Sequence, residues 1–102
     1  PELVGTYTVL LAENIAPDAP LHDRLHNRYR DAVDIITSII ERGQNSGNYR
    51  TDLNAANKAV EILAFINGME ILWLLDPSIS LTEVFKEYAD SLARDLAPSR
   101  LT

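Results

Sequence analysis

The sequence predicts an all-α domain of about four helices packed as an antiparallel bundle. Apolar residues recur every three or four positions through most of the chain, which is the period of a helix with one buried side. Turn-forming residues interrupt this pattern at several places, and no segment shows strand alternation or an internal repeat. With 102 residues, 46% of them hydrophobic and 24% charged, the chain has the length and composition of a single domain.

The first predicted helix covers residues 2–15. Asn14 falls within its apolar side, so the side-chain amide needs a hydrogen-bond partner if it is buried. Pro17 and Pro20 end the helix, because a residue that precedes proline is biased away from the helical conformation. The apolar side is formed by Leu3, Val4, Tyr7, Leu10, Leu11 and Ile15.

The second predicted helix covers residues 21–42. Gly43 follows it at the position that favours a left-handed C-cap. Residues 44–52 are polar and contain glycine, which indicates a loop, and Asn54 or Asp52 is placed to cap the next helix. The apolar stripe of the second helix consists of Leu21, Leu25, Tyr29, Ala32, Val33, Ile36, Ile39 and Ile40.

The central predicted helix, residues 54–75, contains the longest apolar run, and the other helices are expected to pack on it. A polar face in its first half ends at Glu61, and beyond this residue the helix is apolar nearly all round. Such a helix is buried on two sides, which 102 residues can hardly achieve alone. The missing side chain of Gly68 permits close approach by a helix of a second copy or of the same chain. We predict a symmetric homodimer, whose interface includes Phe65, Gly68, Leu72 and Leu75.

The final predicted helix covers residues 81–97, after Asp76 and Pro77 end the central helix. Ser80 and Glu83 have the spacing of a capping box, which marks the start of this helix. The apolar stripe consists of Leu81, Phe85, Tyr88, Ala89, Leu92 and Leu96.

Composition and charge exclude several classes of function. The chain has no cysteine and therefore no disulfide, thiol nucleophile or cysteine metal site. Its net charge of -6 opposes binding to duplex DNA, which requires a basic surface. Lys58, Glu61 and Glu70 interrupt the central apolar run, so no membrane span is predicted, and without a signal peptide a cytoplasmic location is expected. Because the chain begins at Pro1 and its single methionine is Met69, we interpret it as part of a longer protein.

No set of nucleophile, base and acid can be assembled from the sequence, so we predict no catalytic residue and no enzymatic activity. His22 and His26 are four residues apart on a predicted helix, a spacing that lets two imidazoles share a zinc ion if a third ligand is supplied. The sequence offers no such ligand beside them. We interpret both as residues at the edge of the apolar stripe, and we predict no metal and no cofactor.

Four segments in a fixed order resemble one family. They are LLAENIAPDAP before a long helix, ERGQNSGNYRTDLN between helices, AVEILAFINGMEILWLLDPSISL after it, and a closing amphipathic helix. From Leu10 to Leu96 the chain is similar to the C-terminal domain of TetR-type (tetracycline-repressor-like) transcriptional regulators. Asn54 and Asn67 depart from the family, since many relatives are expected to have Asp there. The matching residues are Gly43, Gly47, Asp52, Leu53, Gly68 and Met69, followed by Trp73, Leu74, Leu75, Asp76 and Pro77.

The resemblance implies that residues 1–102 form one regulatory domain, which binds a small molecule in its helical core and dimerises through its last two helices. DNA is then contacted only through an N-terminal helix-turn-helix domain that is absent from this chain. Helices that precede the chain are expected to contribute part of the pocket. Effectors differ widely across the family, so the resemblance implies a role and not a ligand.

The residues predict a mostly apolar or aromatic small molecule between the helices of Tyr29 and Trp73. Ligand pockets are largely apolar, with a few polar groups that orient the ligand. We expect no cluster of positive charge in this pocket. The alternative is that the polar groups bond to one another or to backbone carbonyls in a filled core. The predicted lining residues are Tyr7, Asn14, Tyr29, Asn67, Glu70 and Trp73.

A second hypothesis is a helical protein-interaction domain that assembles a complex without a small molecule. A closed cavity of roughly 300 Å³ or more, lined by the six residues, favours sensing. A solid core with a large exposed apolar patch favours assembly alone.

Overall fold

The chain is all-α. The computed structural model describes the backbone of residues 2–98 and the side chains of residues 7–98, and over this part it contains four helices and no strand. The side chains of Leu3 and Val4, which the sequence places on the apolar side of the first helix, lie outside the described residues. The helices are α1 (Glu2–Glu13), α2 (His22–Asn45), α3 (Ala55–Leu75) and α4 (Leu81–Leu96), each close to its predicted bounds.

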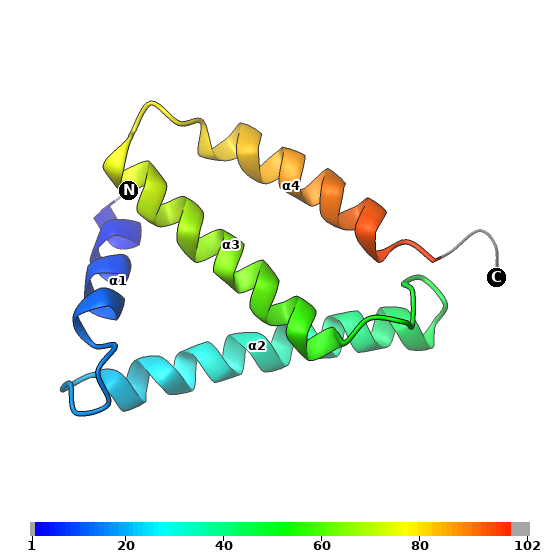
Figure 1. The fold of residues 1–102 in the computed structure, drawn as a ribbon, viewed down its shortest axis with the longest axis horizontal. Coiled ribbons are helices and arrows are strands. Elements are labelled where there is room, and N and C mark those ends of the chain that lie inside the picture. Colours follow the sequence, from blue (N-terminus) through cyan, green and yellow to red (C-terminus); the bar gives the residue numbers. More distant parts are fainter. Residues whose placement is uncertain (1, 99–102) are drawn as a thin grey trace.

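Figure 1 shows α1, α2 and α3 as the three sides of a triangle, with α4 running back along the outer side of α3. Contacts join α3 to both α2 and α1. The molecule is thin, with principal extents of 48 × 34 × 16 Å. Its radius of gyration is 15.9 Å, whereas a compact domain of this length has a value of roughly 13 Å. The helices therefore form an open layer, and the predicted antiparallel bundle is not closed within one chain.

The buried core is small and lies mainly where α2 and α3 meet. Ile40 near the end of α2 and Ala55 and Ala59 at the start of α3 are buried, and Figure 1 shows the start of α3 passing close to α2. The alanines have short side chains, which allows two helices to approach closely. The buried hydrophobic side chains of the described residues are Leu25, Ile40, Ala55, Ala59, Met69 and Leu96.

Gly43 is not the left-handed C-cap that the sequence predicts. Helix α2 continues to Asn45, and the positive φ in the following loop belongs to Gly47, at 84°. The ring of Tyr49 lies so close to Gly43 that an added Cβ would clash with it. The backbone amides of Asn48 and Tyr49 both donate to the Gly43 carbonyl, at 2.9 and 3.0 Å, and fold the loop back onto the helix end. Glycine is required at position 43 for this close packing and not for its backbone conformation.

The two predicted N-caps are confirmed. The side-chain oxygens of Asn54 and Ser80 each accept a hydrogen bond from the backbone amide three residues on, at 2.9 and 3.3 Å. These bonds satisfy amides that lack a partner within the first helical turn. Asp52, the other possible cap of α3, instead forms a bidentate ion pair with the Arg50 guanidinium, with N–O distances of 2.6 and 2.8 Å.

An aromatic cluster and an ion pair hold α4 against α3. The ring of Phe65 stacks on Tyr88 with centroids 3.8 Å apart and meets Phe85 edge-on at 5.7 Å. Toward the other end of α4, the Lys58 ammonium donates to the Asp95 carboxylate. Aromatic pairs in these geometries are stabilising beyond the area they bury.

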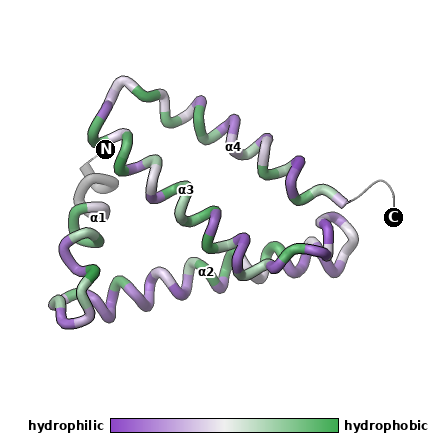
Figure 2. Tube along the Cα trace, viewed as in Figure 1, coloured by the Kyte–Doolittle hydropathy of each residue, from purple (hydrophilic) through white to green (hydrophobic). Residues whose placement is uncertain are grey.

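Hydrophobic and hydrophilic segments alternate along α2 and α4, as Figure 2 shows, which is the pattern of amphipathic helices. The apolar stripe predicted for α4 is buried or half-buried, except at the exposed Ala89. None of the helices in the described part of the chain is long and apolar enough to cross a membrane.

Candidate ligand cleft and apolar face

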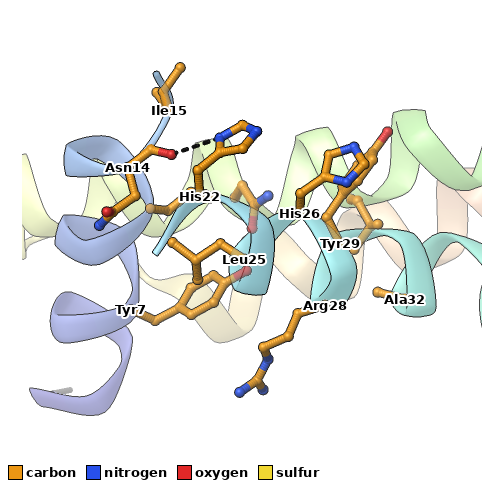
Figure 3. Close-up of a pocket in the computed structure, with 12 residues that line it drawn as sticks. Tyr7, Asn14, Ile15, His22, Leu25, His26, Arg28, Tyr29 and Ala32 are labelled. Atoms are coloured by element: carbon orange, nitrogen blue, oxygen red, sulfur yellow. Dashed lines mark hydrogen bonds between the residues drawn. The ribbon is translucent and has the colours of Figure 1, made fainter. Parts of the chain in front are cut away.

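A cleft with a volume of about 350 Å³ lies between α1, α2 and α3 and is partly open to solvent. Small-molecule sites have volumes of roughly 300–1,000 Å³, so this one suits a small ligand. We call it the α1–α2 cleft, because most of its lining comes from these two helices and the segment between them (Figure 3). Its lining residues are Tyr7, Leu11, Asn14, Ile15, His22, Leu25, His26, Arg28, Tyr29, Ala32, Leu63 and Asn67.

The structure brings four of the six predicted lining residues to this cleft. They are Tyr7, Asn14, Tyr29 and Asn67. Glu70 and Trp73 are half-buried elsewhere on α3 and do not line it. Six residues along a helix correspond to a rotation of about 120° from the starting side chain, so Asn67 and Trp73 cannot face one cleft. A ligand bound in this cleft would therefore lie beside Tyr29 but not against Trp73, which differs from the position predicted between the two residues.

Asn14 is buried, with 7% of its surface exposed, and it holds the corner between α1 and α2. Its side-chain amide donates to the Leu10 carbonyl at 2.7 Å, and its side-chain oxygen accepts from the Leu21 amide at 2.9 Å. Its backbone carbonyl lies 3.1 Å from Nδ1 of His22. The side chain of Asn14 is therefore hydrogen-bonded within the protein, as the alternative hypothesis expects, although the residue also borders the cleft.

The cleft lining includes three basic or imidazole side chains that the sequence analysis did not place there. His22 and His26 stack with ring centroids 5.9 Å apart and an interplanar angle of 20°, and the His26 ring lies 6.1 Å from that of Tyr29. Arg28 is the third. Arg28 is the one guanidinium among these lining residues, and no Asp or Glu lines the cleft. The spacing of His22, His26 and Tyr29 along one side of α2 is the signal that could have located them.

Across the described residues no group of three His, Cys, Asp or Glu side chains is placed to hold a metal ion. The two stacked imidazoles are the nearest approach to such a group in the cleft. Their side chains, with Tyr7 and Asn67, provide hydrogen-bonding groups beside the apolar Leu11 and the other aliphatic lining.

A second candidate site is the exposed side of α3. Leu72 and Leu75 are 48% and 81% exposed, and a Cβ added at Gly68 would meet no atom within 4 Å. Close approach of another helix of the same chain therefore does not explain Gly68. Phe65 differs from these residues, because its ring is covered by Tyr88 and Phe85 of α4. We call Gly68, Leu72 and Leu75 the α3 apolar face.

A polar network joins the start of α3 to the end of α4. Burial by itself would lower the pKa of Lys58, but hydrogen bonds from its ammonium to Asp95 and Glu61 raise that pKa overall. The same hydrogen bond from Lys58 lowers the pKa of Asp95. Arg50 adds a longer contact to Asp95 at 3.8 Å, and its backbone amide donates to the Leu96 carbonyl at 2.8 Å. These contacts join segments that are distant in the sequence, so the network holds the end of α4 against the start of α3.

Glu70 is the one carboxylate of α3 whose pKa burial raises. It is half-buried and lies outside the α1–α2 cleft. The cleft and the α3 apolar face are features of the described residues that fit a binding function. Comparisons of the chain with protein-family models, with curated proteins and with solved structures give no match.

Proposed function

We propose that this chain is the effector-sensing and homodimerisation domain of a TetR-type transcriptional regulator that acts in the cytoplasm. A small, mostly apolar effector binds in the α1–α2 cleft and controls operator binding by an N-terminal DNA-binding domain of the full-length protein. The chain itself has no catalytic role and needs no metal or cofactor. The observation that carries the proposal is that one helix, α3, contributes Asn67 to the cleft and exposes Leu72 and Leu75 on another side.

The lining of the cleft supports sensing. Aliphatic side chains from all three helices, including Leu11, Leu25 and Leu63, form most of its apolar surface. Polar groups of Tyr7 and Asn67 are available at its edge to orient a ligand. This combination of apolar walls and few polar groups is the usual character of small-molecule sites.

The surface area of the chain supports association with a second copy. It exposes 7437 Å², whereas a monomeric protein of 11.4 kDa exposes about 5,800 Å². The excess, about 1,600 Å², is roughly twice the 800 Å² that each partner buries in an interface of standard size. A twofold pairing through the α3 apolar face would remove Leu72 and Leu75 from water, and burial of each is worth about 1.5 to 3 kcal/mol at most. Paired in this way, α3 and α4 with their copies would form the closed four-helix bundle that one chain lacks.

Sedimentation over a range of chain concentrations tests the dimer. The unmodified chain should sediment as a dimer, and Leu72→Glu should give monomers or aggregates, because it places two unpaired carboxylates near the axis. Ile35→Glu is the matched control, since Ile35 is 62% exposed but lies on α2. A monomer of the unmodified chain, or a dimer that tolerates Leu72→Glu, would contradict the assigned interface.

A thermal-shift screen of a metabolite library tests sensing. A ligand present at about one hundred times its Kd stabilises the folded state by roughly 2.7 kcal/mol, which a melting experiment resolves. The stabilisation should be lost in Tyr29→Ala, whose side chain lines the cleft and is more than a third exposed. A ligand that stabilises this variant and the unmodified chain equally would place the site elsewhere.

The alternative function, assembly without a small molecule, is favoured by a second exposed apolar strip on α2. Ile35 and Ile39 are both exposed there, away from the α3 apolar face. If no ligand stabilises the chain and Ile35→Glu abolishes association while Leu72→Glu does not, assembly through α2 is the correct function.

A further inference from the structure

The α1–α2 cleft is locally basic in a chain that is acidic as a whole. The sequence has 15 Asp and Glu against 9 Lys and Arg, for a net charge of -6. None of these carboxylates lines the cleft, whereas Arg28 and both histidines of the chain do. A ligand with one acidic group would therefore meet no like charge in the lining, and the surrounding carboxylates would disfavour its binding elsewhere on the surface.

The hydrogen bond made by His22 determines which ring nitrogen faces a ligand. Its Nδ1 lies 3.1 Å from the backbone carbonyl of Asn14, and a carbonyl oxygen can only accept. Nδ1 therefore carries a hydrogen, and in the neutral ring Nε2 is an unprotonated acceptor. Figure 3 shows this bond and the opposite edge of the ring directed away from Asn14.

His26 supplies a second imidazole on the same side of α2. The two rings are nearly parallel, with centroids 5.9 Å apart, and they project to the same side of the helix in Figure 3. The two oxygens of one carboxylate can accept from two donors at such a separation, because each hydrogen bond spans about 2.8 Å. The Arg28 side chain extends away from both rings (Figure 3), so it contributes to the charge of the cleft without joining this pair.

We propose that the effector is a small monocarboxylic acid with an apolar body. This inference rests on the proposed sensing function of the cleft. The carboxyl group lies at His22 and His26, and the body lies against Leu11, Leu25 and Leu63. An acid that arrives protonated transfers its O–H proton to Nε2 of His22. When the acid arrives ionised, Nε2 of His22 takes up a proton from the solvent. The product in both cases is an imidazolium and a carboxylate, and no covalent bond to carbon changes.

This chemistry excludes two other ligand classes. An amide or ester of the same shape carries no proton acidic enough to transfer to Nε2, so it forms no charge-assisted hydrogen bond. A phosphate ester carries nearly two charges, which call for a guanidinium fork directed at the group. The only guanidinium of the lining, that of Arg28, is directed elsewhere (Figure 3).

Binding of matched acid and amide probes to the 102-residue chain tests the proposal. Octanoate and phenylacetate are compared with octanamide and phenylacetamide by calorimetry at one pH. Each acid should bind at least about tenfold more tightly than its amide, as expected for a hydrogen bond between charged groups. His26→Gln should weaken this preference, because it removes one of the two imidazoles that hold the carboxylate, and it should leave melting unchanged because His26 is exposed. Arg30→Gln, which removes a positive charge of α2 outside the lining, is the matched control and should retain the preference.

Every other outcome contradicts the proposal in a distinguishable way. Equal binding of acids and amides would overturn the acid class and leave the cleft as a sensing site. A preference that is as strong in His26→Gln as in the unmodified chain would overturn the role of the imidazole pair. A preference lost equally in Arg30→Gln would show a general effect of charge. If neither acids nor amides bind, the acid class is wrong, and the metabolite screen and the sedimentation experiment decide the proposed function separately.

Discussion

Phe65→Ala should detach α4 from α3 and lower the stability of each chain by about 4 kcal/mol. Truncation of a fully buried Phe costs about 3–5 kcal/mol, and the half-buried Phe65 should lose about half of this. Loss of two aromatic pairs adds about 0.5–1.5 kcal/mol each, since the ring stacks on Tyr88 at 3.8 Å and meets Phe85 edge-on. In a domain of this size such a loss lowers the Tm by more than about 10 °C.

Urea and thermal denaturation at two chain concentrations measure this effect. Far-UV circular dichroism follows all helices, and fluorescence of Trp73, the single tryptophan, reports on α3. Leu72→Ala is the control, because Leu72 lies about two turns further along the same side of α3 but is exposed. The loss caused by Phe65→Ala should not depend on concentration, whereas any loss caused by Leu72→Ala should.

A different pattern would refute the intrachain role of Phe65. If Phe65→Ala costs no more than Leu72→Ala, and both losses vary with concentration, then Phe65 stabilises the dimer and not the attachment of α4. That result would restore the interface predicted from sequence, in which Phe65 belongs with Leu72.

Three further predictions follow from single contacts. Asn14→Ala should lower the free energy of unfolding by about 1–3 kcal/mol in urea titrations, because it leaves two backbone groups without partners at the α1–α2 corner. Gly43→Ala should cost more than Gly47→Ala, since the first must displace the Tyr49 ring and the second adds only about 1–2 kcal/mol of backbone strain; equal costs would contradict this packing. Glu70→Gln should raise stability at neutral pH, because burial raises the folded pKa of Glu70 above its ordinary 4.5. The stabilising contribution of Glu70 is complete below pH 4.5 and is lost as pH rises through the folded pKa, so the benefit of Gln should vanish in acid; a benefit that persists there would contradict the shift.

The helices could be predicted because local chemistry determines their ends. Asn54 and Ser80 cap the helices that follow them through bonds to amides three residues away, and such bonds require no tertiary contact. Gly43 was misread because its role depends on the ring of Tyr49, which returns over the helix end through the loop. Periodicity describes one helix at a time, so it contains no information about this contact.

The α1–α2 cleft was harder to predict for the same reason. Tyr7, Tyr29 and Asn67 were placed on inward sides of their helices, and the cleft brings them together. Trp73 is also half-buried but does not line the cleft, and a list of inward residues cannot separate the two environments. The histidines were assessed as metal ligands and as residues at the edge of the apolar stripe. The absence of carboxylates around them became visible once three helices were in place.

The geometry of α3 limits how an effector could influence the proposed dimer. Its buried contact with α2 involves Ala55 and Ala59 near its start, whereas the α3 apolar face lies toward its end. Small side chains at the contact leave room for a slight rotation of one helix on the other. From Ala59 to Leu75 the helix is about 24 Å long, so a rotation of about 5° at the contact would move its far end by about 2 Å. A ligand held between His22 and Leu63 contacts α3 between its buried start and the α3 apolar face. It changes the pairing of two chains only if it binds more tightly when α3 lies at one angle to α2 than at another.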